Sequence, residues 1–154
     1  MESQRVEDLY KSLEEIINTV DKQVVSKLEI DKCKRIINRL SSFSTECEVC
    51  YQHFTDLEKH VTSLKDKKSE LTADDIKHHK QIVSNISSHL QKQHKLVPSG
   101  YYLGIYMSIG TSLGIVFGLV LFDNIALGLP LGIGIGVAIG SGLDADVKKK
   151  GLSL

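Results

Sequence analysis

The sequence predicts an all-α membrane protein with two parts: a cytosolic helical bundle or coiled-coil region, and then a glycine-rich two-helix transmembrane hairpin. Three observations predict this class. Residues 1–99 contain 16 basic and 16 acidic residues and no glycine, whereas all 12 glycines lie at or after position 100. Apolar residues in the first part recur at spacings of three and four, as in amphipathic helices. Two later windows carry no formal charge, and each is long enough to cross a bilayer as a helix.

The first predicted helix covers about residues 3–40, with a bend near 25–30. Its first apolar seam consists of Val6, Tyr10, Leu13, Ile17, Val20 and Val24. A second seam follows and consists of Ile30, Cys33, Ile37 and Leu40. The two seams are out of phase, so the chain is expected to bend or to change its packing partner between them.

Two further amphipathic helices are predicted over residues 46–67 and 73–96. The segment SSFST at 41–45 ends the first pattern, and Thr72 with Asp75 can cap the last helix. The stripe of the earlier helix is Cys47, Cys50, Phe54, Leu57, Val61 and Leu64, and that of the later one is Ile76, His79, Val83, Ile86 and Leu90. One narrow stripe per helix buries little area alone, so residues 1–95 are expected to form a bundle that can also self-associate.

Residues 96–143 are predicted to form the transmembrane hairpin, with its turn at Asp123 and Asn124. No charged residue lies between Lys95 and Asp123, and none lies between Asp123 and residue 144. Pro130 leaves the second limb open to a kink, or to a late start that would make it short for a full span.

The charges around the hairpin predict its orientation. Lysines precede the first span and recur in the basic tail at 144–154, whereas the turn has none. By the positive-inside rule, both termini face the cytosol. The charged N-terminus lacks the apolar segment of a secretory signal, and an odd number of cysteines fits a reducing compartment.

The hairpin glycines are spaced by four residues, which places them on one face of each helix. They are Gly110, Gly114 and Gly118 in the first span, and Gly128, Gly132, Gly136 and Gly140 in the second. Such faces allow close helix–helix packing in lipid. The two faces can meet within one hairpin, or between chains in a homo-oligomer or pore, and the spacing alone leaves both arrangements open.

One local group of residues predicts metal chemistry. Cys47, Cys50 and His53 are three residues apart on one helix, and Cys33 lies about level with His53 if the chain folds back near Phe43. Together these four residues can make a Cys₃His zinc site. The alternative is that the cysteines pack as small apolar side chains in the helix seams.

Two segments resemble known families. The run from HLQKQHKLVPSG to the tail DADVKKKG is similar to the C-terminal hairpin of small uncharacterised bacterial glycine-zipper membrane proteins. This resemblance implies a bacterial inner-membrane setting and no defined activity. Residues 43–60, FSTECEVCYQHFTDLEKH, resemble part of the zinc-binding anti-sigma domain, whose His-x₃-Cys-x₂-Cys motif is matched at Cys47 and Cys50. Phe43 stands where that motif has its histidine.

These observations lead to three hypotheses about function. The first is a membrane-anchored interaction or regulatory protein that binds itself or a cytosolic protein partner, with membrane lipid around its anchor. The second is an oligomeric small pore or membrane-permeabilising effector gated by the bundle, and the third is a zinc- or thiol-dependent anti-sigma-like regulator. The net charge of zero gives no reason to expect nucleic acid as a partner. The sequence shows no nucleophile–base pair or phosphate loop, so no enzyme is expected.

Overall fold

The computed structural model describes residues 2–67 and 70–154, and it places seven α-helices in them. The chain divides into two compact units, of which the first consists of the residues up to His94 together with Leu154, and the second spans Lys95–Ser153. The predicted all-α class is confirmed.

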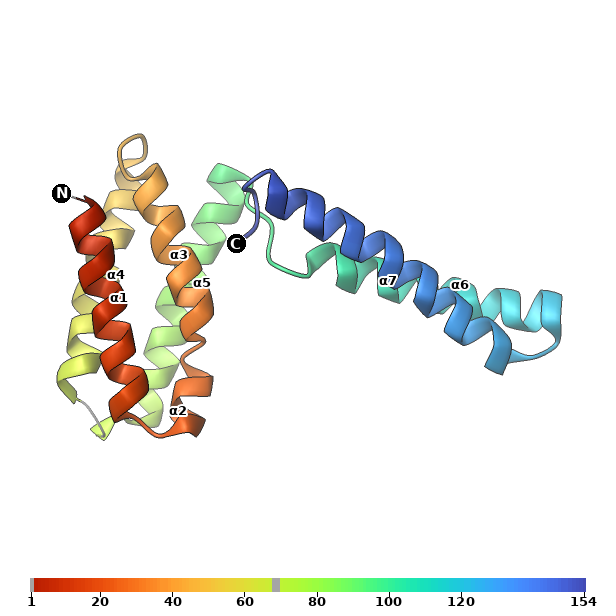
Figure 1. Cartoon of the computed structure of the whole chain (residues 1–154), viewed down its shortest axis with the longest axis horizontal. Coiled ribbons are helices and arrows are strands. Elements are labelled where there is room, and N and C mark those ends of the chain that lie inside the picture. The colour runs from red at the N-terminus through yellow and green to blue at the C-terminus, as the bar shows by residue number, and fades with distance from the viewer. Residues whose placement is uncertain (1, 68–69) are drawn as a thin grey trace. The chain divides into compact units, whose positions relative to one another are not determined.

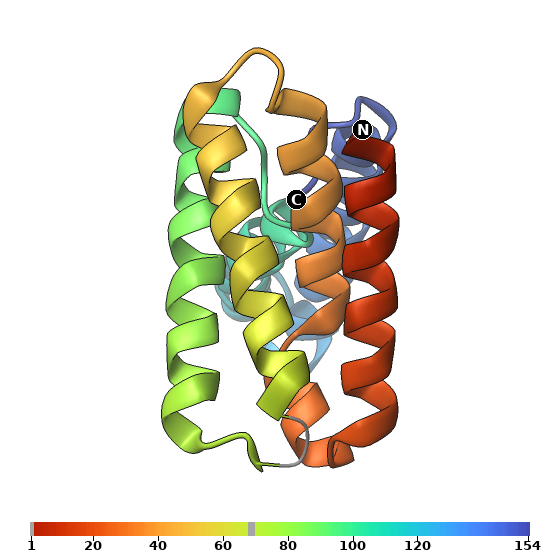
Figure 2. The ribbon, with the colours of Figure 1, turned by 90° about the vertical axis from the view of Figure 1, so that its left-hand side faces the viewer.

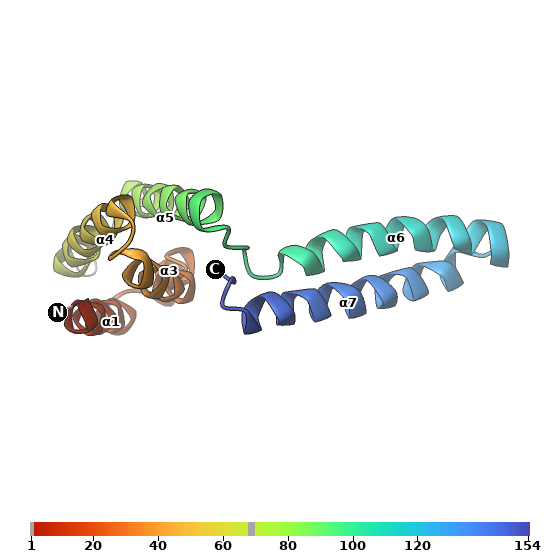
Figure 3. The same ribbon diagram turned by 90° about the horizontal axis from the view of Figure 1, so that it is seen from above.

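The first unit is a bundle of four long helices and one short helix. These are α1 (Glu2–Thr19), α2 (Lys22–Lys27), α3 (Ile30–Phe43), α4 (Glu48–Lys67) and α5 (Ala73–His94). The four long helices lie side by side (Figures 2 and 3), and successive ones run in opposite directions (Figure 1). The start of α4 and the end of α5 therefore lie at the same end of the bundle.

Residues 3–40 form three helices where the sequence predicts one bent helix. Asp21 caps α2, since its side chain accepts a hydrogen bond from the backbone N–H of Gln23 at 2.7 Å. Glu29 then adopts a left-handed backbone with φ of 48°, which separates α2 from α3. The change of direction thus falls where the two predicted seams go out of phase.

The core of the bundle is built from one apolar stripe on each long helix. The stripes of α3, α4 and α5 include the buried residues Ile30, Cys33, Ile37, Leu40, Cys50, Phe54, Leu57, Val61, Leu64, His79, Val83, Ile86 and Leu90. The predicted first seam is right at Leu13 of α1 and at Val20 just beyond it, and wrong at Ile17. Ile16 is 1% exposed, whereas Ile17 of the predicted seam is 40% exposed. The buried stripe there steps through Leu9, Leu13, Ile16 and Val20, because α1 packs against both α3 and α4 rather than one partner.

The helices of the second unit are α6 (Tyr101–Phe122) and α7 (Ile125–Lys149), which lie side by side along their length (Figure 3). Of the described helices, these two are long and apolar enough to cross a membrane. At the turn, Asp123 has a left-handed backbone with φ of 47°, and Asn124 caps α7 by accepting from the N–H of Ala126 at 2.9 Å. The second limb is continuous through Pro130 and extends past residue 143 into the predicted tail.

The glycines bring the backbones of α6 and α7 into direct contact. A Cβ atom added to Gly114 would lie 2.6 Å from the carbonyl oxygen of Gly128 and 3.0 Å from the Cα of Gly132. Comparable contacts surround the other glycines of the two predicted faces, Gly110, Gly118, Gly136 and Gly140. The two faces therefore meet within one chain. By contrast, an added Cβ at Gly134 or Gly142 would meet nothing within 4 Å.

The open end of the hairpin is closed by polar contacts. Asp144 accepts hydrogen bonds from the backbone N–H groups of Tyr102 at 3.2 Å and Leu103 at 3.0 Å, so a residue of α7 caps the start of α6. Beyond α7, the N–H of Val97 donates to the carbonyl of Leu152 at 2.8 Å. Residues 144–153 of the predicted tail are therefore part of the folded hairpin unit.

Candidate metal centre

Cys47 and Cys50 lie at the start of α4. The N–H of Cys47 donates to the carbonyl of Phe43 at 2.9 Å, and the carbonyl of Cys47 accepts from the N–H of Tyr51 at 3.1 Å. Cys47 therefore stands where the chain enters the helix, and Cys50 follows one turn later. Cys50 is fully buried, whereas Cys47 is partly exposed. The helix N-terminus favours negative charge, so it is a suitable place for thiolates.

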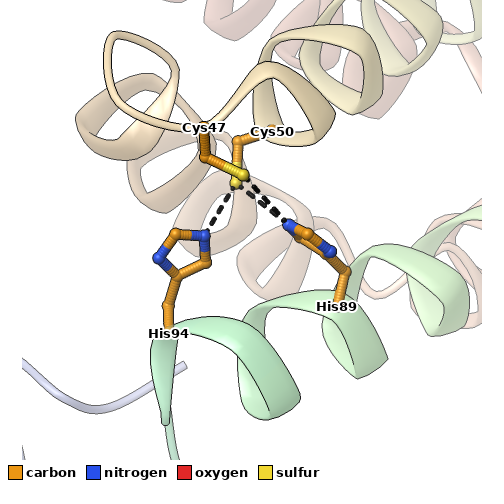
Figure 4. A group of neighbouring side chains, drawn as sticks. All are labelled: Cys47, Cys50, His89 and His94. Atoms are coloured by element: carbon orange, nitrogen blue, oxygen red, sulfur yellow. Dashed lines mark hydrogen bonds between the residues drawn. The ribbon is translucent and has the colours of Figure 1, made fainter.

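His89 and His94 lie on the last turns of α5. Because α4 and α5 are antiparallel, these turns face the start of α4, and both imidazoles point at the two sulfur atoms (Figure 4). Both histidines are partly exposed. The start of α4 and the end of α5 are far apart in the sequence, and each contributes two ligands.

The four ligand atoms form a compact group. The Nε2 atom of His89 lies 3.5 Å from the Sγ of Cys47 and 3.4 Å from the Sγ of Cys50. The Nε2 atom of His94 lies 3.2 Å from the Sγ of Cys50. All four ligand atoms lie within 4.8 Å of one another.

Three of these separations are close to those of a tetrahedral zinc site. With Zn–S near 2.3 Å and Zn–N near 2.0–2.1 Å, the sulfur and nitrogen ligands of a regular tetrahedron are about 3.6 Å apart. The three measured S···N distances, 3.2–3.5 Å, are close to that value. A Cys₂His₂ donor set is also one that structural zinc commonly has. The group could therefore hold a metal ion.

Neighbouring rings orient the two histidines. The ring of His94 stacks on Phe43, with centroids 4.0 Å apart and an angle of 21° between planes. The ring of His53 meets His89 edge-on, with centroids 5.3 Å apart. Such outer contacts fix the direction of a ligand, which raises the affinity of a metal site.

The protonation of the group without metal is set by burial and by mutual proximity. Burial raises the pKa of the Cys50 thiol to about 12, and the neighbouring Cys47 adds to the rise. Burial lowers the pKa of His89, and the rings of His53 and His94 lower it further. Neutral imidazoles are the form that binds metal, whereas the thiols must lose protons when the ion enters.

Two of the four predicted ligands belong to this group. Cys47 and Cys50 are members, whereas Cys33 and His53 are not in it among the described residues. Cys33 is fully buried in α3, where it packs as an apolar side chain and burial raises the pKa of its thiol to about 12. His53 lies beside the group, as the edge partner of His89.

The sequence analysis did not predict His89 and His94 as ligands, because it considered only the residues that an antiparallel turn near Phe43 brings together. The same argument at the next turn, centred near residue 70, places Cys50 level with about residue 90 and Cys47 level with about residue 93. It would have found both histidines. This chain has Phe43 where the anti-sigma motif has its histidine, and the ring of His94 stacks on Phe43.

Comparison with known proteins bears on the hairpin rather than on the metal centre. No curated protein and no solved structure matched the chain. With its apolar helices, the hairpin makes the chain a membrane-associated helical protein. Residues 98–146, which cover α6 and most of α7, match the family of glycine zipper membrane proteins, in agreement with the predicted resemblance.

Proposed function

We propose that this protein is a membrane-anchored, non-enzymatic interaction protein whose N-terminal bundle is held by a zinc ion at Cys47, Cys50, His89 and His94. The observation that carries the proposal is the convergence of these four ligands from the start of α4 and the end of α5. A site with four protein ligands is of the structural kind, because no coordination position is left for a substrate.

The proposed role of the zinc ion is to fix two helix ends. The N–H of Cys47 is already bonded to the end of α3, and His94 is the last residue of α5. An ion bound there ties three helices of the bundle together at one end. A rigid bundle presents a defined surface to a second copy or to a cytosolic protein partner.

The hairpin is proposed to anchor the bundle at the bacterial inner membrane with both termini in the cytosol. The support is the position of the lysines, which lie before the start of α6 and at the end of α7 and are absent from the turn between them. The contacts of the glycines favour an anchor over a pore, since both glycine faces are occupied by the partner helix of the same chain.

Metal analysis of the full chain in mild detergent tests the proposal. We expect about one zinc ion per chain, because the four ligands form a single group in the described residues. Cys47→Ser and His94→Asn should each lower the zinc content and the thermal stability of the bundle. Cys33→Ser is the matched control and should retain the ion, since Cys33 lies outside the group. Metal-free protein with full helix content and unchanged stability after zinc addition would contradict the proposal.

A further inference from the structure

We propose that Cys47 and Cys50 are also a reversible modification site, at which a hydroperoxide converts the two zinc-bound thiolates into an intrachain disulfide and releases the ion. This inference rests on the proposed zinc binding. It adds that the same four-residue site is sensitive to oxidation.

The arrangement of the three cysteines supports this inference. The Sγ atoms of Cys47 and Cys50 lie within 4.8 Å of each other, one turn apart at the start of a helix. Side-chain rotation there can bring the sulfur atoms to the bonding distance of about 2.05 Å. Cys33 is fully buried on α3 and lies outside the group, so it is not a competing partner.

The two cysteines differ in exposure, and this difference decides which of them reacts first with the oxidant. Cys47 is partly exposed where the chain enters α4, whereas Cys50 is fully buried beneath it. A small oxidant therefore reaches Cys47 first, and Cys50 is the resolving thiol. Zinc coordination keeps both sulfurs as thiolates, which is the nucleophilic form of cysteine.

The reaction balances with one hydroperoxide. The Cys47 thiolate attacks the peroxide, so that an S–O bond forms, the O–O bond breaks, and hydroxide or alkoxide leaves. The Cys50 thiolate then attacks the Cys47 sulfur, the S–S bond forms, and the S–O bond breaks with loss of hydroxide. Two electrons pass from the two sulfurs to the peroxide, and zinc leaves as Zn²⁺ with its charge unchanged.

The loss of both thiolates removes half of the ligands of the ion. His89 and His94 are then the remaining ligands, and both belong to α5. The link between the start of α4 and the end of α5 is therefore lost on oxidation. Thiol reductants of the cytosol reverse the step, as expected for a disulfide that forms transiently in a reducing compartment.

The test uses the zinc-loaded full chain in mild detergent with hydrogen peroxide as the probe. Zinc release is followed with a coloured chelator, and the free thiols are counted in parallel. We expect the zinc to be released almost completely, the free thiols to fall from three to one, and peptide mass analysis to find Cys47 joined to Cys50. A reductant with added zinc should restore both signals.

Matched variants keep the result interpretable. Cys33→Ser should release zinc and form the disulfide like the wild type, with thiols falling from two to none. Zinc-loaded protein that keeps its ion and three thiols, or that forms only disulfides between chains, would overturn the inference while leaving zinc binding intact. Protein that contains no zinc before peroxide is added refutes the proposed function instead, so the two failures are distinguishable.

Discussion

Two buried imidazole nitrogens of the bundle, His60 Nε2 and His79 Nδ1, have no hydrogen-bond partner in the described part of the chain. The Nε2 atom of His79 lies 3.0 Å from the carbonyl oxygen of Leu28, which can only accept, so Nε2 carries the proton of the neutral ring. A second proton would have to enter at the buried Nδ1 without a partner. Burial accordingly lowers the pKa of His79.

The half-buried His60 also has a buried ring nitrogen without a described partner and a lowered pKa, so the stability of the bundle should depend on pH. Burial lowers its pKa from 6.5 to about 4, with further lowering by His79, His78 and Lys67, and Asp75 opposes the shift. Below pH 6.5 the unfolded chain binds more protons at this residue than the folded chain does. Stability should therefore fall as the pH falls from about 6.5 towards 4. Screening at a half-exposed ring limits the loss to about 1 kcal/mol.

Denaturant unfolding of the full chain in detergent at pH 7.5 and pH 5.0 checks this expectation. His60→Gln cannot be protonated, so it should lose less stability on acidification than the wild type does. The metal ligands are the same in both proteins, so the contribution of metal release cancels in the comparison. Identical losses in the two proteins would show that His60 does not contribute.

At the scale of the elements, the packing of α6 on α7 depends on the absence of side chains at the facing glycines. A Cβ atom added to Gly132 would lie 2.6 Å from the Cα of Gly114, and the obstacle is backbone, which cannot rotate away. Gly134, two residues along the same helix, has nothing within 4 Å of an added Cβ. Substituting each of the two glycines by alanine therefore separates the steric effect of a side chain in the interface from the effect of replacing a glycine in the helix.

We expect Gly132→Ala to push α6 and α7 apart, with a loss of about 1–3 kcal/mol as in other overpacked interfaces. Gly134→Ala should leave the packing unchanged. Magnetic resonance contacts between the Hα atoms of Gly118 and Gly128 report on the packing in the full chain. These contacts should be lost in the first variant and kept in the second. Their survival in Gly132→Ala would show that the hairpin is packed differently.

The capping of α6 by Asp144, at the open end of the hairpin, leads to a second prediction for these two helices. Asp144 accepts from the N–H groups of Tyr102 and Leu103, and hydrogen bonds to a charged acceptor contribute about 1.5–3 kcal/mol. Asp144→Ala should therefore speed hydrogen exchange at those two amides by about tenfold or more.

Asp146 offers the matched control for this measurement. It pairs with Lys150 at 2.7 Å as an exposed i,i+4 pair, and no hydrogen bond joins it to the start of α6 in the described residues. Asp146→Ala should leave the exchange of Tyr102 and Leu103 unchanged. Equal exchange in both variants would mean that Asp144 does not cap α6.

The whole molecule divides into a charged bundle and an apolar hairpin, and this division predicts how the chain is held at the membrane. Apart from Leu154, the first unit ends at His94, and the two helices that could span a membrane lie in the second unit. A chain that ends after residue 94 should therefore leave the membrane fraction almost completely and keep its helical signal. The full chain should resist extraction at alkaline pH, because its two apolar helices remain in lipid.

The control for this experiment is full-length Cys47→Ser, which should stay in the membrane fraction although it lacks a zinc ligand. A truncated chain that remains in the membrane fraction would show that the bundle itself holds the protein there. The experiment thus separates the role of the hairpin from that of the metal centre.

The sequence by itself determined the helical class, the two apolar spans and the turn at Asp123 and Asn124. These features depend on local properties, namely charge, apolar spacing and caps, which are visible within a window of some twenty residues. Which of Ile16 and Ile17 is buried on α1 was not predictable in this way, because the two are equally apolar and only the directions of α3 and α4 decide between them.

Only the tertiary structure decided which residues meet. It paired the glycines of α6 with those of α7 inside one chain, whereas their spacing alone equally allowed contacts between chains. It also joined Cys47 and Cys50 to His89 and His94, some 40 residues later, and left Cys33 in the core. The physical reason is that a metal site or a helix interface depends on distances between side chains of different helices, and those distances are fixed by how the helices pack.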